Sequence, residues 1–324
     1  MSIRPITHRL RLPYTNEAFP SGVLANGSSE LTVTWDEILW AALTIGRPSV
    51  HHVFAHGAAS FHEAIFRLSL VRMALEQYGP TATRLRRTSA YKNLDPTEKG
   101  AISYFLGMTF CKVFSSRLLS TPWLLHLDVF KSTIPTSVLG RSRPDLFGQQ
   151  TGSGDWLSFE TKGRASKPSS ADLAKAKAQA ARLVSVNGSP CTLHVGSFAF
   201  FANDALHFHW IDPPSDPKKP IKVPETGDAW RFYYGPSKAL WDAFGRETRV
   251  QDQAGLGFEL PFLDLTIKVH PLLAPFFIEE NWVGAQRAML ELGEQLGTEG
   301  FQLDGLKFES GPSWRNRVDS PPIE

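Results

Sequence analysis

The chain has 324 residues, of which 42% are hydrophobic, and its nine Trp and 22 Phe indicate a well-packed globular protein rather than a disordered one. A net charge of +2 does not by itself indicate a nucleic-acid partner. The sequence has two cysteines in apolar segments, no signal peptide and no apolar run of about 18 residues. We therefore expect a soluble cytoplasmic protein that does not cross a membrane.

The first 90 residues carry few functional signals. Residues 8–12 and 31–35 are predicted strands, and residues 61–77 are a predicted helix. This part is expected to be an N-terminal accessory region for substrate recognition or dimerisation. It contains a group of histidines that would suit a metal if they were helical, but no partner residue accompanies them at zinc spacing, so coincidence is the favoured interpretation. These residues are His51, His52, His56 and His62.

A helix start is predicted at Asp95. Asp95 suits the N-cap, Pro96 the first helical position, and Glu98 lies three residues after the cap, as in a capping box. The apolar residues that follow predict a largely buried helix to about residue 119. Residues 123–130 then predict a strand.

The main motif is Arg143-Pro144-Asp145, with Glu160-Thr161-Lys162 beginning fifteen residues after Asp145. The segments predict a hairpin with Asp145 on its first strand and Glu160 on its second. Glu160 and Lys162 then share one face, while Thr161 points away. Two carboxylates and the Thr161 carbonyl are hard oxygen ligands that suit Mg²⁺, and a lysine on the same face can orient a water. Phosphodiester hydrolysis is the reaction that this set suits best.

The segments after the motif alternate between helix and strand signals. Ser169 suits an N-cap, and the Ala-rich segment after it predicts a helix to about Val186. Residues 191–201 and 206–211 predict strands, and His207 and His209 are expected to lie on one strand face. Closely spaced prolines in residues 212–220 predict a linker. Beyond it we expect strands at 230–235 and 258–269, a helix at 282–296, and a poorly ordered tail after Ser310.

These residues resemble a known signature. Pro144-Asp145 and Glu160-Thr161-Lys162 resemble that of the PD-(D/E)XK nuclease superfamily, and the order helix, three strands, helix, strand, strand is similar to its core. The resemblance covers residues 91–211. It implies an α/β fold with a restriction-endonuclease-like core, a mixed sheet flanked by helices, between accessory regions 1–90 and 212–324.

The resemblance also implies roles for the motif residues. Asp145 and Glu160 would bind Mg²⁺, for which Mn²⁺ could substitute, and Lys162 would be the catalytic lysine. Many members place another acidic residue on the helix before the first strand, which points here to Glu98. The capping box explains Glu98 equally well, and Glu63 is a poorer candidate.

Further candidates surround the motif. Some members use a Gln on the later helix, where Gln179 lies, although a solvated helix face is the favoured alternative. Arg141, Arg143 and Arg164 are candidates for binding phosphates.

The charge distribution adds one indication of a partner. Residues 91–211 contain 13 Lys and Arg against 8 Asp and Glu, whereas residues 212–324 contain 12 against 18. Arg84, Arg86 and Arg87 form a small basic cluster just before the core. This asymmetry is consistent with a nucleic-acid partner, although imbalances of this size also arise without function.

The expected function is Mg²⁺-dependent hydrolysis of DNA, as an endonuclease in restriction or antiviral defence, with DNA repair as a competing setting. Cutting both strands would require a homodimer or two visits, and a partner protein could be required for activity. The alternatives are a non-cutting nucleic-acid-binding or assembly subunit, an RNase, and an ordinary hairpin with a coincidental motif. No Walker A, G-x-G-x-x-G or G-x-S-x-G pattern occurs.

Overall fold

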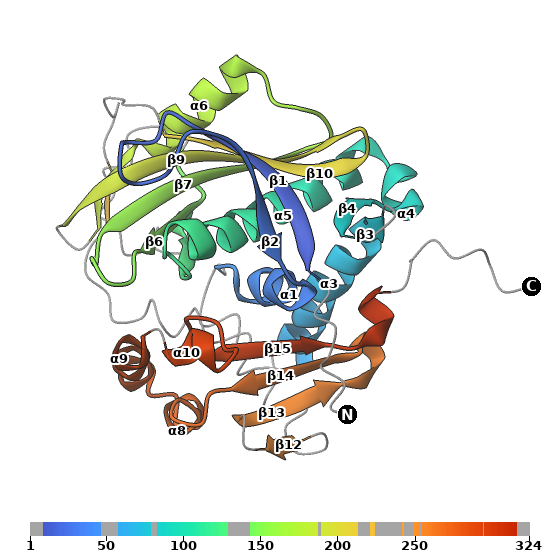
Figure 1. Ribbon diagram of the computed structural model, residues 1–324, viewed down its shortest axis with the longest axis vertical. Coiled ribbons are helices and arrows are strands. Elements are labelled where there is room, and N and C mark those ends of the chain that lie inside the picture. Colours follow the sequence, from blue (N-terminus) through green and yellow to red (C-terminus); the bar gives the residue numbers. More distant parts are fainter. Residues whose placement is uncertain are drawn as a thin grey trace, which may run out of the picture.

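The structure is a computed structural model. It describes residues 9–46, 58–78, 83–128, 143–186, 189–212, 221–223, 242, 249–252, 255–293 and 295–315. Figure 1 shows the helix α6 (Ser170–Ala180) on one face of a large sheet and the helix α5 (Pro96–Leu118) across the other. A mixed α/β fold with a sheet flanked by helices is thereby confirmed.

The large sheet is mixed, and its described part has 11 strands with the main order β2-β1-β10-β9-β7-β6-β5. Off this path, β4 pairs with β3 and β10, and β8 pairs with β9 and β11. The strands are β1 (Leu10–Glu17), β2 (Gly27–Val33), β3 (Leu75–Tyr78), β4 (Arg84–Arg87), β5 (Leu124–His126), β6 (Leu146–Gln149), β7 (Trp156–Arg164), β8 (Leu183–Val186), β9 (Ser189–Ala202), β10 (Ala205–Ile211) and β11 (Ile221–Val223).

The predicted order of elements within residues 91–211 is confirmed except for one additional strand, β8, between α6 and β9. After α5, the strands β5, β6 and β7 form an antiparallel meander, and α6 then leads to β9, which is parallel to β7. The strand β10 returns antiparallel to β9. A parallel neighbour of this kind requires a crossover, which α6 provides.

Two predicted helices extended too far at their C-terminal ends, and both corrections have the same cause. The helix expected to reach Val186 ends at Ala180, and residues 183–186 form β8. The helix expected over 61–77 is α3 (Ala58–Ala74), and residues 75–78 form β3. Each short strand pairs with a neighbouring strand, β8 with β9 and β3 with β4. Sheet pairing therefore determined that both segments are strands. In β8 the β-branched Val184 and Val186 also favour a strand.

The helix α5 begins as predicted. Asp95 is the N-cap, its side chain accepts the Thr97 N–H at 2.7 Å, and Glu98 completes the capping box by accepting the Asp95 N–H at 3.1 Å. Most of α5 is buried because the sheet covers one side and the helix α1 (Trp35–Thr44) packs on another. A buried α5 holds the residues behind the candidate site rigidly.

The N-terminal region belongs to the same sheet as the rest of the core. The strand β1 pairs in parallel with β10 and antiparallel with β2, so both strands extend the sheet beyond residues 91–211. A short helix, α4 (Ser89–Lys92), precedes α5.

The C-terminal region forms a second, antiparallel sheet on the far side of α1, as Figure 1 shows. The indole N–H of Trp40 in α1 donates to the Asp304 carboxylate, which links the two regions. The elements are β12 (Arg249–Asp252), β13 (Gly255–Leu260), η2 (Pro261–Leu263), β14 (Leu265–Val269), α8 (Ala274–Ile278), α9 (Trp282–Leu292), α10 (Gln295–Thr298), β15 (Leu306–Ser310) and η3 (Pro312–Arg315).

The tail after Ser310 differs from the prediction. Trp314 is buried, its ring lies 5.6 Å from that of Trp35, and the Arg72 guanidinium lies over it. Apolar burial of one aromatic side chain therefore orders residues 311–315. Residues 316–324, the strand predicted at 230–235 and the linker residues 213–220 lie outside the described residues.

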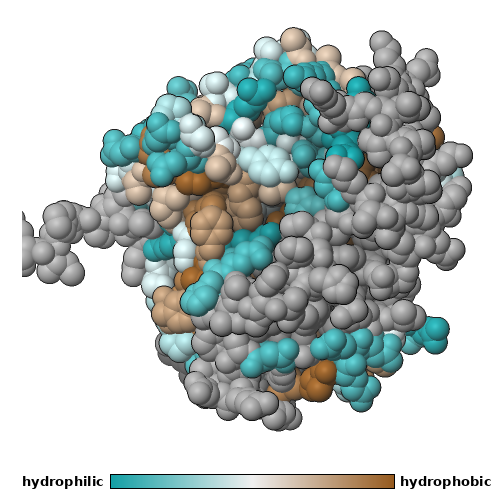
Figure 2. Space-filling view, turned by 180° about the vertical axis from the view of Figure 1, so that it is seen from behind, coloured by the Kyte–Doolittle hydropathy of each residue, from teal (hydrophilic) through white to brown (hydrophobic). Residues whose placement is uncertain are grey.

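The surface mixes polar and apolar residues. Figure 2 shows teal hydrophilic residues interspersed with brown hydrophobic ones on the described part of the face seen from behind. Scattered exposed hydrophobic residues of this kind are normal for folded proteins. Within the described ranges, no helix combines the length and the apolar character that crossing a bilayer requires.

Candidate functional site

The strands β6 and β7 part next to Asp145. Their last paired residues at this end are Leu146 and Phe159, and Pro144 has no N–H with which to continue the ladder. Beyond this point the Asp145 side chain, rather than its backbone, accepts the hydrogen bonds from β7. Its Oδ2 accepts the Thr161 N–H at 2.9 Å and the Thr161 hydroxyl at 3.1 Å. The carboxylate is therefore fixed at the open end of the hairpin.

A second element also holds Asp145. The Tyr104 hydroxyl of α5 donates to Asp145 Oδ1 at 3.3 Å. The helix can approach this closely because β7 carries Gly163, where an added Cβ would lie 1.5 Å from the Ser103 carbonyl oxygen. At Gly107, an added Cβ would lie 2.8 Å from the backbone of Lys162 and Gly163. Two glycines thus permit a backbone-to-backbone contact beside the motif.

Glu160 is buried beside Asp145, with only 1% of its surface exposed. Its Oε1 accepts a hydrogen bond from the Lys162 ammonium, whereas its Oε2 is buried and has no hydrogen-bond partner in the part of the chain that the structure describes. Lys162 itself is about one-third exposed, so its ammonium connects the buried carboxylate with solvent. The predicted pairing of Glu160 and Lys162 on one strand face is thereby confirmed.

The environment makes the charge on Glu160 costly. Burial raises the pKa of Glu160 to about 7, the Asp145 carboxylate adds to the increase, and Lys162 opposes it. An ordinary Glu loses its proton at much lower pH. A further positive charge near Oε2 would satisfy the free oxygen and offset the repulsion between the carboxylates.

Asp145 and Glu160 supply carboxylate oxygens, the donors that a divalent metal such as Mg²⁺ prefers. Nowhere in the described residues do three or more His, Cys, Asp or Glu side chains form a group that could hold a metal ion. Mg²⁺ does not require such a group, because it commonly binds one or two carboxylates and keeps several waters beside a substrate phosphate. Asp145 and the unpartnered oxygen of Glu160 fit this binding mode.

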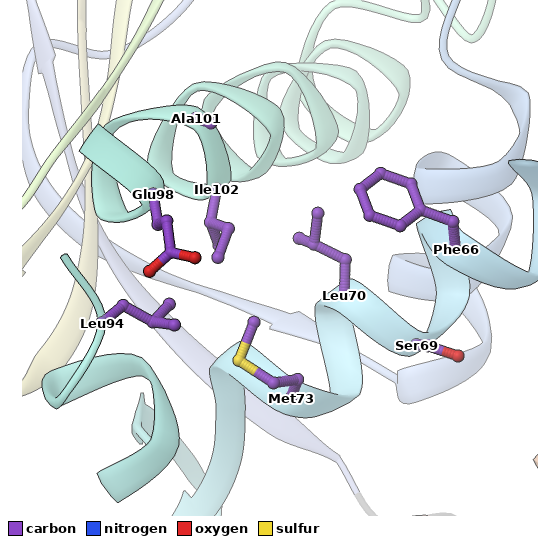
Figure 3. Close-up of a pocket in the computed structure, with 8 residues that line it drawn as sticks. All are labelled: Phe66, Ser69, Leu70, Met73, Leu94, Glu98, Ala101 and Ile102. Carbon is purple, nitrogen blue, oxygen red and sulfur yellow. The ribbon is translucent and has the colours of Figure 1, made fainter. Parts of the chain in front are cut away.

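The structure places Glu98 in a different environment. Its carboxylate completes the capping box of α5, and its side chain lies at one end of an apolar groove between α3 and α5, with Phe66 at the other end (Figure 3). Its carboxylate accepts the Asp95 N–H, and among the described residues no hydrogen bond or ion pair joins it to Asp145 or Glu160. The capping interpretation is confirmed, and no contact supports the predicted metal role.

The predicted phosphate-binding residues are paired with acidic side chains. Arg143 Nε lies 2.6 Å from Asp128, and an Arg164 nitrogen lies 2.7 Å from Asp172. Gln179 is half-buried on α6, next to the buried face of that helix. Arg141 and the histidines 51, 52 and 56 lie outside the described residues.

The basic cluster before the core is neutralised. Each of its three arginines forms an ion pair with a carboxylate of another segment, so the cluster presents less positive charge than its sequence indicates. The pairs are Arg84 with Glu30, Arg86 with Glu76, and Arg87 with Asp204. These three arginines, like Arg143 and Arg164, would have to leave their carboxylates to bind a phosphate.

Tyr104 was missed by the sequence analysis, and Thr161 was expected to offer a carbonyl rather than donate to Asp145. Tyr104 lies 41 positions before Asp145, so no local pattern connects the two residues. The only signals were Gly107 and Gly163, because glycines inside a helix and a strand often mark a close backbone approach.

Comparisons with protein-family models, with curated proteins and with solved structures found no match to this chain. The function is therefore argued from the site alone.

Proposed function

We propose that this protein is a Mg²⁺-dependent nuclease, built on a restriction-endonuclease-like core, that hydrolyses phosphodiester bonds in DNA. One observation carries the proposal: Glu160 is buried within the influence of a second carboxylate, Asp145, and its Oε2 has no hydrogen-bond partner among the described residues. A buried carboxylate is normally satisfied by hydrogen bonds or paired charges, and an exception indicates a functional role.

A second buried carboxylate shows why the neighbour matters. Glu76 is also fully buried with one unpartnered oxygen, but Arg86 pairs with its other oxygen and Arg72 interacts with its charge. Glu76 is therefore surrounded by positive charge, whereas Glu160 faces another carboxylate. Of the two, only Glu160 has an arrangement that attracts a cation.

The residues of the site divide the work of hydrolysis. Asp145 and Glu160 would hold Mg²⁺, which when bound would neutralise phosphate charge and increase the acidity of a bound water. The Lys162 ammonium reaches both Glu160 and solvent. From there it can turn toward a phosphate oxygen or orient the attacking water, and stabilise the negative charge that develops.

Two flanking arginines support a nucleic-acid substrate. Arg143 lies two residues before Asp145, and Arg164 lies two residues after Lys162 on the same strand. Each pairs with a partly exposed carboxylate. Such surface pairs contribute little to stability, so a phosphate can replace the carboxylate at low cost.

The test is cleavage of supercoiled plasmid, linear duplex, single-stranded DNA and RNA with Mg²⁺, Mn²⁺ or EDTA. Asp145→Asn and Lys162→Met should each lower the rate by roughly a hundredfold or more. Asp204→Asn and Lys92→Met are matched controls, because this pair forms an exposed ion pair outside the site. Both controls should cut at the rate of the wild type.

Each outcome has a distinct meaning. Metal-dependent cutting of DNA that is lost in both site variants would support the proposal, and cutting of RNA alone would indicate an RNase. Binding without cutting would favour a non-cutting subunit. If the protein neither cuts nor binds any of the four substrates, the proposal is wrong.

A further inference from the structure

We infer that Tyr104 is a positioning residue that orients Asp145 for metal binding, an inference that rests on the proposed function. The two carboxylates of the site are held very differently. Both oxygens of Asp145 accept hydrogen bonds, Oδ2 from Thr161 and Oδ1 from Tyr104. Glu160 has a donor on one oxygen only.

The placement of Tyr104 is rigid although its side chain is 41% exposed. The preceding residue, Ser103, contacts Gly163 through its backbone, and its hydroxyl forms a 2.6 Å hydrogen bond with the buried Tyr91 hydroxyl. This part of α5 is therefore anchored on both sides. The position of the Tyr104 hydroxyl follows from the backbone, and no loop has to move to bring it to Asp145.

The chemistry of a phenol suits this task. A tyrosine hydroxyl keeps its proton near neutral pH, so it remains a donor toward Asp145. A lysine or arginine in its place would neutralise Asp145 and repel a metal ion. A neutral donor orients the carboxylate and leaves its negative charge available to a cation.

The first test measures Mn²⁺ binding by calorimetry. Wild-type binding that is lost in Glu160→Gln would establish the metal site. Tyr104→Phe, which removes one oxygen atom, should then bind Mn²⁺ about tenfold more weakly. Tyr78→Phe is the matched control, because it removes the same atom from a tyrosine of β3 whose ring lies under the Arg86 guanidinium, outside the site. It should leave the affinity unchanged.

The second test requires no metal. In a crystal structure of the metal-free Tyr104→Phe variant, the Asp145 carboxylate should take a different orientation from that in the wild type, because the hydrogen bond to its Oδ1 is lost.

The outcomes separate the inference from the proposed function. If the wild type binds Mn²⁺ and Tyr104→Phe binds it equally well, the positioning role is wrong and the metal site stands. If the wild type binds no Mn²⁺, the proposed function and this inference are both wrong. An unchanged orientation of the Asp145 carboxylate in Tyr104→Phe would also contradict the inference.

Discussion

Two lysine–carboxylate pairs lie in the large sheet and its covering helix α6. They differ in how fully their polar atoms are hydrogen-bonded and buried. Lys177 of α6 pairs with Asp212, and both side chains are almost fully buried. The same Asp212 oxygen also accepts the His194 N–H at 3.0 Å. In the pair of Glu160 and Lys162, the lysine is partly exposed and one carboxylate oxygen has no partner.

The surroundings of the two pairs also differ, because further hydrogen bonds surround the first pair and a second carboxylate charge acts on the other. Next to Lys177 and Asp212, the Ser158 hydroxyl lies 2.9 Å from His194 Nδ1 and 2.8 Å from the Ala180 carbonyl oxygen, which extends the network to α6. Next to Glu160 lies another carboxylate. A satisfied buried network stabilises a fold, whereas an incomplete one costs stability and is retained where function requires it.

The largest expected effect is on the almost fully buried pair of Lys177 and Asp212. Lys177→Met should lower the free energy of unfolding by about 3–5 kcal/mol, because it leaves the Asp212 charge buried without its partner. Lys162→Met is the matched change in the other pair and should cost less than about 1 kcal/mol, since Glu160 can take up a proton instead. Urea denaturation at pH 7 measures both. Equal losses in the two variants would remove the distinction between the pairs.

The next effect concerns the free energy that the buried charge of Glu160 takes from the stability of the fold. Folding raises the pKa of Glu160 from its ordinary value to about 7, so the folded protein binds more protons than the unfolded chain below this pH. Stability should therefore fall as the pH rises through this range to about 7. At pH 8 in EDTA, Glu160→Gln should be more stable than the wild type by up to about 3 kcal/mol, with little gain at pH 4.5.

Asp204→Asn provides a control of opposite sign. Hydrogen bonds from Lys92 and Arg87 lower the pKa of Asp204, so its charge stabilises the fold at pH 8. Urea denaturation at pH 4.5 and pH 8 distinguishes the effect of Glu160→Gln from that of Asp204→Asn. A Glu160→Gln variant that is less stable than the wild type at pH 8 would contradict the argument from burial.

The smallest of these effects concerns the glycines behind each pair. Gly163→Ala places a Cβ 1.5 Å from a backbone oxygen of α5 and should cost about 2 kcal/mol or more. Gly196→Ala, beside Lys177, places a Cβ 3.0 Å from the nearest atom and should cost less than about 1 kcal/mol. Thermal unfolding compares the two. A larger loss at Gly196 would show that the contact of α5 with β7 does not determine the site.

The sequence predicted the local features well. The capping box at Asp95, the hairpin that carries the motif, and the shared face of Glu160 and Lys162 all follow from patterns within a few residues. Such features depend on backbone hydrogen bonding and side-chain alternation, which neighbouring residues determine. The predicted helix ends were less accurate, because pairing with the next strand along the chain turned residues 75–78 and 183–186 into strands.

The sequence by itself thus determined which residues can do chemistry, and only the tertiary structure decided their surroundings. The arginines 84, 86 and 87 read as a basic cluster, yet each meets a carboxylate from another segment. Tyr104 gave no signal, yet a close contact of α5 with β7 brings its hydroxyl to Asp145. The physical reason is that burial and charge pairing depend on segments far apart in the chain, which come together only when the core packs.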